Sequence, residues 1–426
     1  MLITASDWNL LQRIMFKVLD APWCPRHGLT VSGYKYIIVG GGMTGDSAVK
    51  GIREIDRSGT VAIFSQEGVL PYNRPPLSKG LWKGELTDSI WRASDTWMGE
   101  EKVDFFGSTS VVAIDVSGKA VQTAGGKQYR YEKLLLATGG RPRELSLEAR
   151  NVIYFRTFED YTTLRALSER FSEFVVIGGG FIGSEIAAAL TMSGKKVTMV
   201  FSEKGIGARV YPHSLSLFLS SYYQEKGVDI RSRILVNAVE ETSRGYLVKS
   251  IEGENIYGDA VIAGLGIIPS VELAKASGLA TDNGIVVDEF LKTTNPDIYA
   301  AGDVANFFNP ALDRRIRVEH EDNANMMGKI AGHNMAGAPE PYHHIPFFYS
   351  DLFDLGYEAV GELDSRLETF EDWEEQFRKG VVYYLKDGSV HGVLLWNTWG
   401  KVDAARELIT SKRKFAPGSL MGLIKD

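Results

Sequence analysis

Two stretches of the chain share one order of apolar and polar positions, and this order predicts a strand, a glycine-rich turn, a helix and a second strand. The first stretch has an apolar run at residues 36–39, glycines at 40–45, a helical pattern to about residue 57 and another apolar run at 60–65. The same order returns at residues 173–201, about 137 residues further along. That separation is too long for a repeat-protein period, so we expect two separate βαβ dinucleotide-binding units.

Shorter runs of alternating or continuously apolar residues predict further strands between and after these units. They lie at residues 111–121, 134–137, 231–251, 260–265, 380–385 and 389–396. Proline and aromatic residues cluster from about residue 339 onward, and a helical pattern follows around residues 401–410. The last two runs, together with this helix, predict a third domain of α+β type.

Residues 1–33 predict one amphipathic helix, which ends near Pro22 and Pro25. Arg13 and Lys17 give it a weakly cationic face, which leaves open a membrane-surface or targeting role beside docking on the protein itself or on a partner subunit. The segment lacks the long apolar stretch of a secretory signal. No apolar run of the chain approaches the roughly 18 residues that a transmembrane helix needs, so we expect no transmembrane segment.

The composition of the chain excludes several kinds of redox and metal site. A chain of 426 residues is long enough for two or three domains. Cys24 is the single cysteine, so an internal disulfide, a two-thiol redox centre, a thiolate zinc site and a four-thiolate iron–sulfur cluster are all excluded. The net charge of −7 disfavours nucleic acid as a partner. We therefore expect no metal site, a reducing cytoplasmic setting, and an organic cofactor for any redox chemistry.

The sequence GGGMTG at residues 40–45 carries the chemistry of the first unit. Gly40 allows the tight turn, Gly42 lets the backbone approach a pyrophosphate, and Gly45 lets the helix and strand pack closely. The equivalent residues of the second unit are Gly178, Gly180 and Gly183. Two such units in one chain favour two bound dinucleotides over a pair of turns without ligands.

The residue at the end of the second strand of such a unit normally binds the ribose hydroxyls of the cofactor. In the second unit this residue is Glu203, whose carboxylate predicts NAD rather than NADP, although Lys204 and Arg209 nearby weaken the prediction. In the first unit the place is held by Gln66 and Glu67. The alternative interpretation is that Glu203, Gln66 and Glu67 are solvated surface residues that contact no cofactor.

Three sequences resemble the FAD-contacting motifs of the pyridine nucleotide-disulfide reductase superfamily. They are LPYNRPPLSK at residues 70–79, ATGGRP at 137–142 and YAAGDV at 299–304. The subgroup without redox cysteines fits best, namely ferredoxin and rubredoxin reductases and the apoptosis-inducing factor family. Features typical of the last family are RVEH at residues 317–320, YSDL at 349–352 with GYE at 356–358, and the late run GVVYYL at 380–385 with VLLWN at 393–397. The similarity extends over roughly residues 34–412.

The resemblance implies an α/β fold with two Rossmann-like, glutathione-reductase-like dinucleotide-binding domains and a C-terminal α+β interface domain. It places FAD in the first domain and NAD in the second. The implied boundaries are an N-terminal helical extension at 1–33, an FAD-binding domain at 34–150 and 267–338, an NAD-binding domain at 151–266 and the C-terminal domain at 339–426.

The resemblance also implies roles for individual residues. Lys79 would lie beside the flavin N5 and pair with Glu185, which keeps the ammonium charged beside a ring that gains negative charge on reduction. Asp303, near the start of a helix, would bind the FAD ribityl chain. Arg74 and Arg156 would face the phosphates or the ring edge of the flavin.

Other positions follow from the same motifs. The backbone of Val111 would meet the adenine, Gly266 would join Glu203 and Arg209 on the NAD side, and Glu319 and His320 would border the meeting point of nicotinamide and flavin. The remaining cofactor contacts implied are Met43, Thr44, Ala137, Thr138, Gly139, Phe181, Ile182 and Glu358.

Two departures from the family pattern stand out. Tyr349 occupies the position that usually carries a tryptophan stacked near the flavin and nicotinamide, and tyrosine offers less area and a polar tip. The long regulatory insertion of animal members is reduced to an acidic stretch at about residues 365–379. We therefore do not expect NADH-driven dimerisation through that insertion, and a homodimer formed by other surfaces is kept as a hypothesis.

The function implied is hydride transfer from NADH to FAD, followed by electron transfer to an acceptor that the sequence does not identify: a ferredoxin, a rubredoxin, a quinone or a small molecule. A ferredoxin or rubredoxin reductase component is the second enzyme hypothesis, and Lys412, Arg413 and Lys414 are its one obvious basic cluster. A third hypothesis, of another class, is a non-catalytic NADH-sensing assembly factor.

Overall fold

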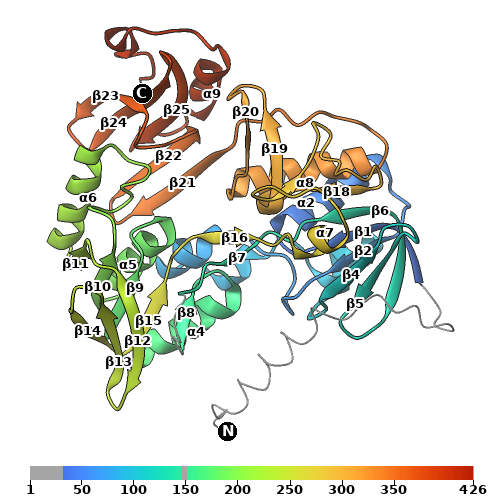
Figure 1. Cartoon of the computed structure of the whole chain (residues 1–426), viewed down its shortest axis with the longest axis horizontal. Coiled ribbons are helices and arrows are strands. Elements are labelled where there is room, and N and C mark those ends of the chain that lie inside the picture. The colour runs from blue at the N-terminus through green and yellow to red at the C-terminus, as the bar shows by residue number, and fades with distance from the viewer. Residues whose placement is uncertain (1–31, 146–150, 426) are drawn as a thin grey trace.

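The computed structural model describes residues 32–145 and 151–425. The helix expected within residues 1–33 therefore lies almost wholly outside the described residues. The described chain forms three units, each built on its own large sheet (Figure 1). This is the expected α/β fold with a third, antiparallel unit.

The first unit is built on a sheet in the order β3-β2-β1-β6-β5-β4, with β18 also paired to β6. Strands β1, β2, β3, β6 and β18 run parallel. The runs 36–39, 61–64, 134–136 and 298–300 are continuously apolar and buried, as expected for strands covered on both faces, whereas the edge strand β3 is only partly buried. Helices α2 and α8 pack against each other on this sheet. The elements are β1 (Ser32–Val39), α2 (Met43–Ile55), β2 (Val61–Phe64), β3 (Val103–Phe106), β4 (Val111–Asp115), β5 (Ala120–Thr123), β6 (Gln128–Leu136), β18 (Ile298–Ala300) and α8 (Glu321–Met335). Segments from both ends of the chain thus share one sheet.

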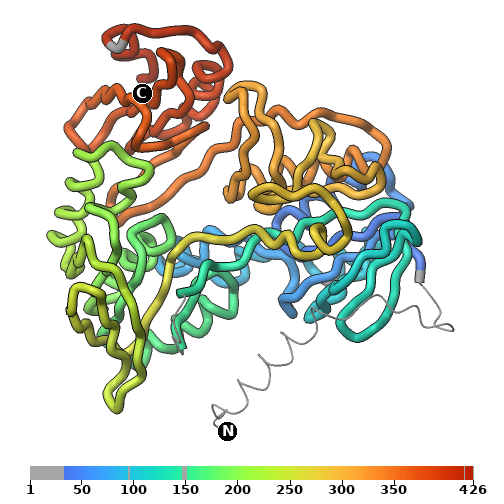
Figure 2. Tube along the Cα trace, in the orientation of Figure 1, coloured from blue at the N-terminus to red at the C-terminus, as the bar shows by residue number. Residues whose placement is uncertain are grey.

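The second unit lies between those segments in sequence. Its parallel sheet has the order β11-β10-β9-β15-β8, and a three-stranded antiparallel sheet, β12-β13-β14, lies beside it. The elements are β8 (Val152–Tyr154), α4 (Phe158–Arg170), β9 (Glu173–Ile177), α5 (Phe181–Met192), β10 (Lys196–Phe201), α6 (His213–Glu225), β11 (Asp229–Ser232), β12 (Val236–Thr242), β13 (Gly245–Ser250), β14 (Asn255–Gly258) and β15 (Ala260–Ala263). The chain enters and leaves this unit through β7 (Gly140–Pro142) and β16 (Ile267–Pro269), which pair antiparallel and run side by side between the two units (Figure 2).

The third unit is an antiparallel sheet in the order β21-β22-β25-β24-β23, covered by α9. The elements are β21 (Phe347–Leu352), β22 (Leu355–Gly361), β23 (Glu368–Glu375), β24 (Lys379–Lys386), β25 (Ser389–Trp396) and α9 (Val402–Thr410). The acidic stretch interpreted as a reduced insertion is largely strand β23, which pairs with β24 at the edge of the sheet. Acidic side chains suit this place, because charges on an edge strand discourage pairing with other chains.

The remaining elements are short, and β17, β19 and β20 among them form a small sheet of their own. They are α3 (Asp95–Glu100), α7 (Glu272–Ala276), β17 (Ile285–Val286), β19 (Ala305–Asn309), β20 (Arg314–Ile316) and the 3-10 helices Pro75–Ser78, Gly80–Trp82, Thr87–Ile90, Gly302–Val304 and Pro417–Leu420. No helix in residues 32–145 or 151–425 combines the length and apolar character needed to cross a bilayer.

One apolar cluster joins the three units. It contains Leu77 and Trp82 from the first unit, Ile186 from the second, and Tyr357 and Trp396 from the third. Because these side chains are almost fully buried, their contacts hold the units in one arrangement.

Candidate functional site

Both glycine-rich turns are shaped by close backbone contacts. Gly40 has a φ of +128°, and a Cβ there would lie 2.1 Å from the Ala137 carbonyl oxygen. In the second turn Gly178 has a φ of +116°, and a Cβ on Gly183 would lie 2.0 Å from the Gly178 oxygen. These positions admit only glycine.

The middle glycines behave differently. A Cβ on Gly42 or Gly180 would meet no protein atom within 4 Å. Each residue directly precedes a helix, α2 or α5, whose first N–H groups have no partner within the helix. A pyrophosphate fits such a place, since it needs both open space above the backbone and the positive end of a helix.

A cavity of about 340 Å³, here called the cofactor cavity, lies where the three units meet. Eleven of the residues expected from sequence line it, which is why we regard it as the candidate active site. They are Met43, Arg74, Lys79, Arg156, Phe181, Ile182, Glu185, Asp303, Glu319, His320 and Tyr349.

The expected pair of Lys79 and Glu185 is present in this cavity. Lys79 Nζ lies 2.8 Å from Glu185 Oε1, and the two side chains are 11% and 3% exposed. The carboxylate also accepts hydrogen bonds of 2.6 Å from Ser78 Oγ and from Ser350 Oγ. A buried carboxylate needs such partners, because an unpaired charge in the interior is costly.

Arg156 and Asp303 form a second ion pair at the cavity, with Arg156 Nη2 2.8 Å from Asp303 Oδ2. Asp303 lies near the start of a helix that follows strand β18, as expected, and this helix is the one-turn 3-10 helix Gly302–Val304, after which the chain continues into β19. Arg74 pairs with Glu67 at 2.5 Å and donates to the Arg156 carbonyl oxygen. The pairs Arg156–Asp303 and Arg74–Glu67 thus hold both arginines in place before any ligand binds.

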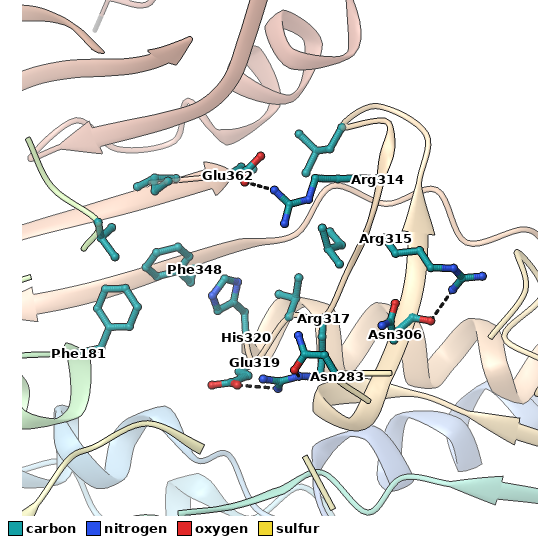
Figure 3. Close-up of a pocket in the computed structure, with 16 residues that line it drawn as sticks. Phe181, Asn283, Asn306, Arg314, Arg315, Arg317, Glu319, His320, Phe348 and Glu362 are labelled. Carbon is teal, nitrogen blue, oxygen red and sulfur yellow. Dashed lines mark hydrogen bonds and ion pairs between the residues drawn. The ribbon is translucent and has the colours of Figure 1, made fainter. Parts of the chain in front are cut away.

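Glu319, His320 and Phe348 also line the cavity. Figure 3 shows the His320 ring beside Phe348, and their ring centroids are 4.2 Å apart. Burial lowers the pKa of His320 to about 4, although Asp303 and Asp322 act in the opposite direction. Burial also acts on Glu319, whose pKa it raises. Arg317, whose Nη1 lies 2.6 Å from Glu319 Oε1, acts in the opposite direction. His320 is therefore neutral at physiological pH.

This lowered pKa predicts a pH-dependent stability. Between pH 6.5 and about 4 the unfolded chain protonates residue 320 and the folded chain does not, so stability falls as the pH falls through this window. In His320→Gln the midpoint of thermal unfolding should decrease less between pH 7 and pH 5 than in the parent protein. The exposed His213 provides the control, since His213→Gln should keep the parent's slope. Equal slopes for the parent and His320→Gln would contradict the buried neutral imidazole.

Tyr349, at the position of the usual tryptophan, is partly exposed at the cavity. Lys79 Nζ lies 5.4 Å from the centre of its ring, and Glu321 accepts a hydrogen bond of 3.4 Å from its hydroxyl. Tyr349 therefore presents a flat face to the cavity beside the ammonium.

The residues expected on the NAD side lie outside this cavity. Glu203 Oε1 lies 2.6 Å from Arg209 Nη2, and the side chains are 26% and 83% exposed. Gly266 has a φ of +84° in the loop before β16, and a Cβ there would meet no atom within 4 Å. Glu203, Arg209 and Gly266 are thus accessible, and the arginine partly neutralises the carboxylate that was expected to select NAD.

Other expected contacts are placed near the first unit. Thr44 packs against Gly302, and Thr138 Oγ1 donates a hydrogen bond to the Ser270 carbonyl oxygen. A Cβ added to Gly139 would lie 3.8 Å from Arg156 Nη2. Val111 is a buried residue at the start of β4, away from the cavity lining, and Gln66 follows β2.

The structure does not bring Glu358 to the cavity. Its carboxylate accepts a hydrogen bond of 3.0 Å from the Gly400 N–H, within the third unit. Tyr349 and Glu358 are directly paired between β21 and β22. The motifs at residues 349–352 and 356–358 are therefore neighbours in the sheet, although only Tyr349 lines the cavity.

Several residues at the site had no assigned role in the sequence analysis, among them Ser78 and Phe348 in the lining and Ser350, which bonds to Glu185. Ser78 and Ser350 lie inside motifs that were recognised, next to Lys79 and Tyr349. Their role appears only once the third unit packs on the second, because Ser350 reaches Glu185 across 165 residues.

Comparison with known proteins agrees with this geometry. Residues 34–328 match the family described as "Pyridine nucleotide-disulphide oxidoreductase". Residues 331–374 and 370–411 match the family described as "Apoptosis-inducing factor, mitochondrion-associated, C-term". The chain is 34% identical over 423 residues to "Apoptosis-inducing factor 1, mitochondrial" of Dictyostelium discoideum, covering 90% of this chain and 79% of that one. It is 31% identical to "Putidaredoxin reductase CamA" of Pseudomonas putida, covering 90% of this chain and 93% of that one.

Among solved structures, the reductase chain in the "covalent putidaredoxin reductase-putidaredoxin complex" superposes with a TM-score of 0.85 at 30% identity, covering 91% of this chain and 96% of that one. The family match extends over more than half of this chain, and its residues include both glycine-rich turns and the Lys79–Glu185 pair. The chain belongs to the pyridine nucleotide-disulphide oxidoreductase family, and it is a flavin oxidoreductase dependent on a pyridine nucleotide, with a C-terminal region of the apoptosis-inducing factor type.

Proposed function

We propose that the protein binds FAD in the first unit and NADH in the second, and that it oxidises NADH and passes the electrons to a separate acceptor. The buried Lys79–Glu185 pair is the observation that carries this proposal. It places a fixed ammonium in a cavity that lies between two open, phosphate-compatible turns. When bound, FAD would supply the redox chemistry by accepting a hydride from NADH.

The roles of the protein's own residues follow from their surroundings. The turn around Gly42 and the N-terminus of α2 would hold the FAD pyrophosphate, with Arg74 and Arg156 nearby. The turn around Gly180 would hold the pyrophosphate of NADH. Lys79 would stabilise negative charge at the reacting end of the cavity, and Phe181, His320 and Phe348 would keep water away from it.

The experiment that tests this function is reconstitution followed by anaerobic reduction. The purified protein should be yellow, contain non-covalent FAD in a ratio of about one per chain, and lose its flavin absorbance on addition of NADH. Folded protein that takes up no FAD would overturn the proposal.

We further propose that NADH is preferred over NADPH because of Glu203. A carboxylate accepts hydrogen bonds from a free 2′-hydroxyl and repels a 2′-phosphate. In Glu203→Ala, the released Arg209 is free to pair with that phosphate, so the ratio of kcat/KM for NADH to that for NADPH should fall by about tenfold or more. Glu173, an exposed glutamate of the same unit paired with Lys196, is the matched control, and Glu173→Ala should leave the ratio unchanged. A parent protein that uses both nucleotides equally would show that Glu203 does not select.

The identity of the acceptor separates the remaining alternatives. The relatives named as reductases of putidaredoxin and rubredoxin support a small iron–sulfur or rubredoxin-type protein as acceptor. The C-terminal region matches that of apoptosis-inducing factor and not a named reductase, so a non-catalytic NADH-sensing assembly protein is the second candidate. A screen of ferredoxin, rubredoxin, a soluble quinone and oxygen against the NADH-reduced protein distinguishes them. Fast turnover with a protein acceptor supports the reductase, and a long-lived reduced state supports the sensor.

The proposed setting is the cytoplasm, because the single cysteine is compatible with a reducing compartment. The mitochondrial relative provides the competing location, and cell fractionation decides between them. A homodimer is the oligomeric state to test by light scattering with and without NADH.

A further inference from the structure

Strand β21 brings a side chain of the third unit to the Lys79–Glu185 pair of the cofactor cavity. β21 is the edge strand of its sheet and packs against α5, the helix that carries Glu185 (Figure 1). Ser350 lies in this strand and is 1% exposed. Its hydroxyl donates a hydrogen bond of 2.6 Å to Glu185 Oε1. No role in binding or catalysis followed for this serine from the sequence motifs.

The two oxygens of the Glu185 carboxylate have different partners. Oε1 lies 2.8 Å from Lys79 Nζ and also accepts the hydrogen bond from Ser350. Oε2 accepts a hydrogen bond of 2.6 Å from Ser78 Oγ, in the residue next to Lys79 in sequence. Ser350 therefore shares one oxygen with the ammonium, whereas Ser78 does not.

Hydrogen bonds determine how this carboxylate is oriented. The last torsion of a glutamate side chain has a broad energy profile, so the covalent structure alone does not fix the plane of the carboxylate. Ser78 on one oxygen and Ser350 on the other hold this plane from two sides. Without the Ser350 hydroxyl, Oε1 would keep only the ammonium as a partner among the described residues and would follow any movement of Lys79.

The hydroxyl also changes how strongly Oε1 attracts the ammonium. A donated hydrogen bond partly balances the negative charge on the oxygen that receives it. Tyr211 and Tyr357 interact with the same carboxylate, and burial raises the pKa of both phenols, so neither adds a charge at physiological pH. In such a buried place a single hydrogen bond to a charged group has a large effect. Loss of the Ser350 hydroxyl would draw Lys79 closer to Glu185 and leave less positive potential in the cavity.

We propose that Ser350 is a positioning residue of the third unit, which acts through Glu185 on Lys79 and thereby on the reduction of the bound flavin. This inference rests on the proposed function, because it takes the ammonium to be the group that stabilises negative charge on the reduced flavin. Ser350 itself does not line the cofactor cavity, so we expect it to touch neither nucleotide. The third unit thus takes part in the reaction through a residue that is remote from the substrates.

The first measurement is the midpoint potential of the FAD-loaded protein, titrated anaerobically with dithionite. In Ser350→Ala the ratio of reduced to oxidised flavin at the parent's midpoint should fall by about fivefold, which corresponds to a potential about 20 mV more negative for a two-electron couple. The cause is the smaller positive potential that Lys79 would present to the reduced flavin. Ser389 is the matched control, because it is a serine of the same sheet whose hydroxyl donates to the Lys412 carbonyl oxygen at the surface. Ser389→Ala should keep the parent's potential.

The second measurement separates nucleotide binding from the reaction. In stopped-flow reduction by NADH, Ser350→Ala should lower the limiting rate by about fivefold or more. It should change the NADH concentration for half-saturation by less than about twofold, since the serine does not line the cavity. In the Glu185→Ala background the same substitution should change the limiting rate by less than about twofold, because the residue that connects Ser350 to Lys79 is gone.

Three results would overturn the proposal. A Ser350→Ala variant with the parent's potential and limiting rate would make the serine a packing residue, even if its thermal stability were lower. An effect of the same size in the Glu185→Ala background would show that Ser350 acts by another route. A raised half-saturation at an unchanged limiting rate would place the serine in nucleotide binding.

The parent protein gives a separate outcome for the proposed function. Failure of NADH to reduce its bound FAD would refute that function. The dithionite titration needs no NADH, so the comparison of Ser350→Ala with the parent would still decide the role of Ser350.

Discussion

In Lys79→Ala, the limiting rate of FAD reduction at saturating NADH is expected to fall by about a hundredfold, with a much smaller change in the NADH concentration for half-saturation. The ammonium is buried beside Tyr349 and fixed by Glu185, so it stabilises negative charge that develops during the reaction and is nearly absent before it. Loss of one such preorganised partner typically costs about 2.7 to 4 kcal/mol, and about 1.36 kcal/mol corresponds to a tenfold change in rate.

The measurement is anaerobic stopped-flow reduction, with FAD occupancy checked by absorbance. Lys83 is the matched control, because it lies four residues further along and its ion pair with Asp351 is at the surface; Lys83→Ala should reduce FAD at the parent rate. Glu185→Ala should show a smaller loss than Lys79→Ala, since the ammonium remains but loses its partner. A Lys79→Ala variant with the parent's limiting rate and only a raised half-saturation would make Lys79 a binding residue.

The second large effect concerns the two open glycines, and it separates the two nucleotides. Gly42→Asp should abolish FAD binding, and Gly180→Asp should retain FAD but lose reduction by NADH. Both residues have a φ of −85° and an extended backbone that aspartate adopts readily, and an added Cβ meets no protein atom within 4 Å. The new carboxylate would instead occupy the place of a phosphate and repel it.

The readouts are FAD content after reconstitution and the NADH dependence of flavin reduction, with circular dichroism to show that both variants fold. Gly42→Ala and Gly180→Ala are the matched controls, since they add the same Cβ without the charge. A Gly180→Asp variant that loses FAD, or a Gly42→Asp variant that retains it, would contradict the assignment of the two units.

The parallel sheets and their glycine-rich turns could be predicted from the sequence because their signals are local. The apolar run before Gly40 and the one before Gly178 are each followed directly by the turn and the helix, so neighbouring residues determine the structure. The strands β24 and β25 of the third unit were predictable for the same reason, although both are nearly continuous buried runs and not the alternating strands expected. The fold class expected from these patterns is confirmed by the superposition with the ferredoxin reductase structures.

Residue roles that depend on contacts between units were less accessible. The hydrogen bond from Ser350 to Glu185 requires knowledge of how β21 packs on α5, which no local pattern contains. The pairing of Arg209 with Glu203 was suspected only from their closeness in sequence. Glu358 shows the opposite case, in which a motif placed a residue beside the site, whereas in the structure its carboxylate accepts a hydrogen bond from the Gly400 N–H and does not line the cavity.

Glu185 accepts hydrogen bonds or an ion pair from residues of two other units, Ser78 and Lys79 in the first and Ser350 in the third. The carboxylate is therefore fully satisfied only when all three units are docked. Partial folding leaves it buried without partners or exposed to water, and in either case the ammonium beside it is no longer held. The complete set of contacts around the Lys79–Glu185 pair therefore exists only in a molecule whose three units are docked on one another.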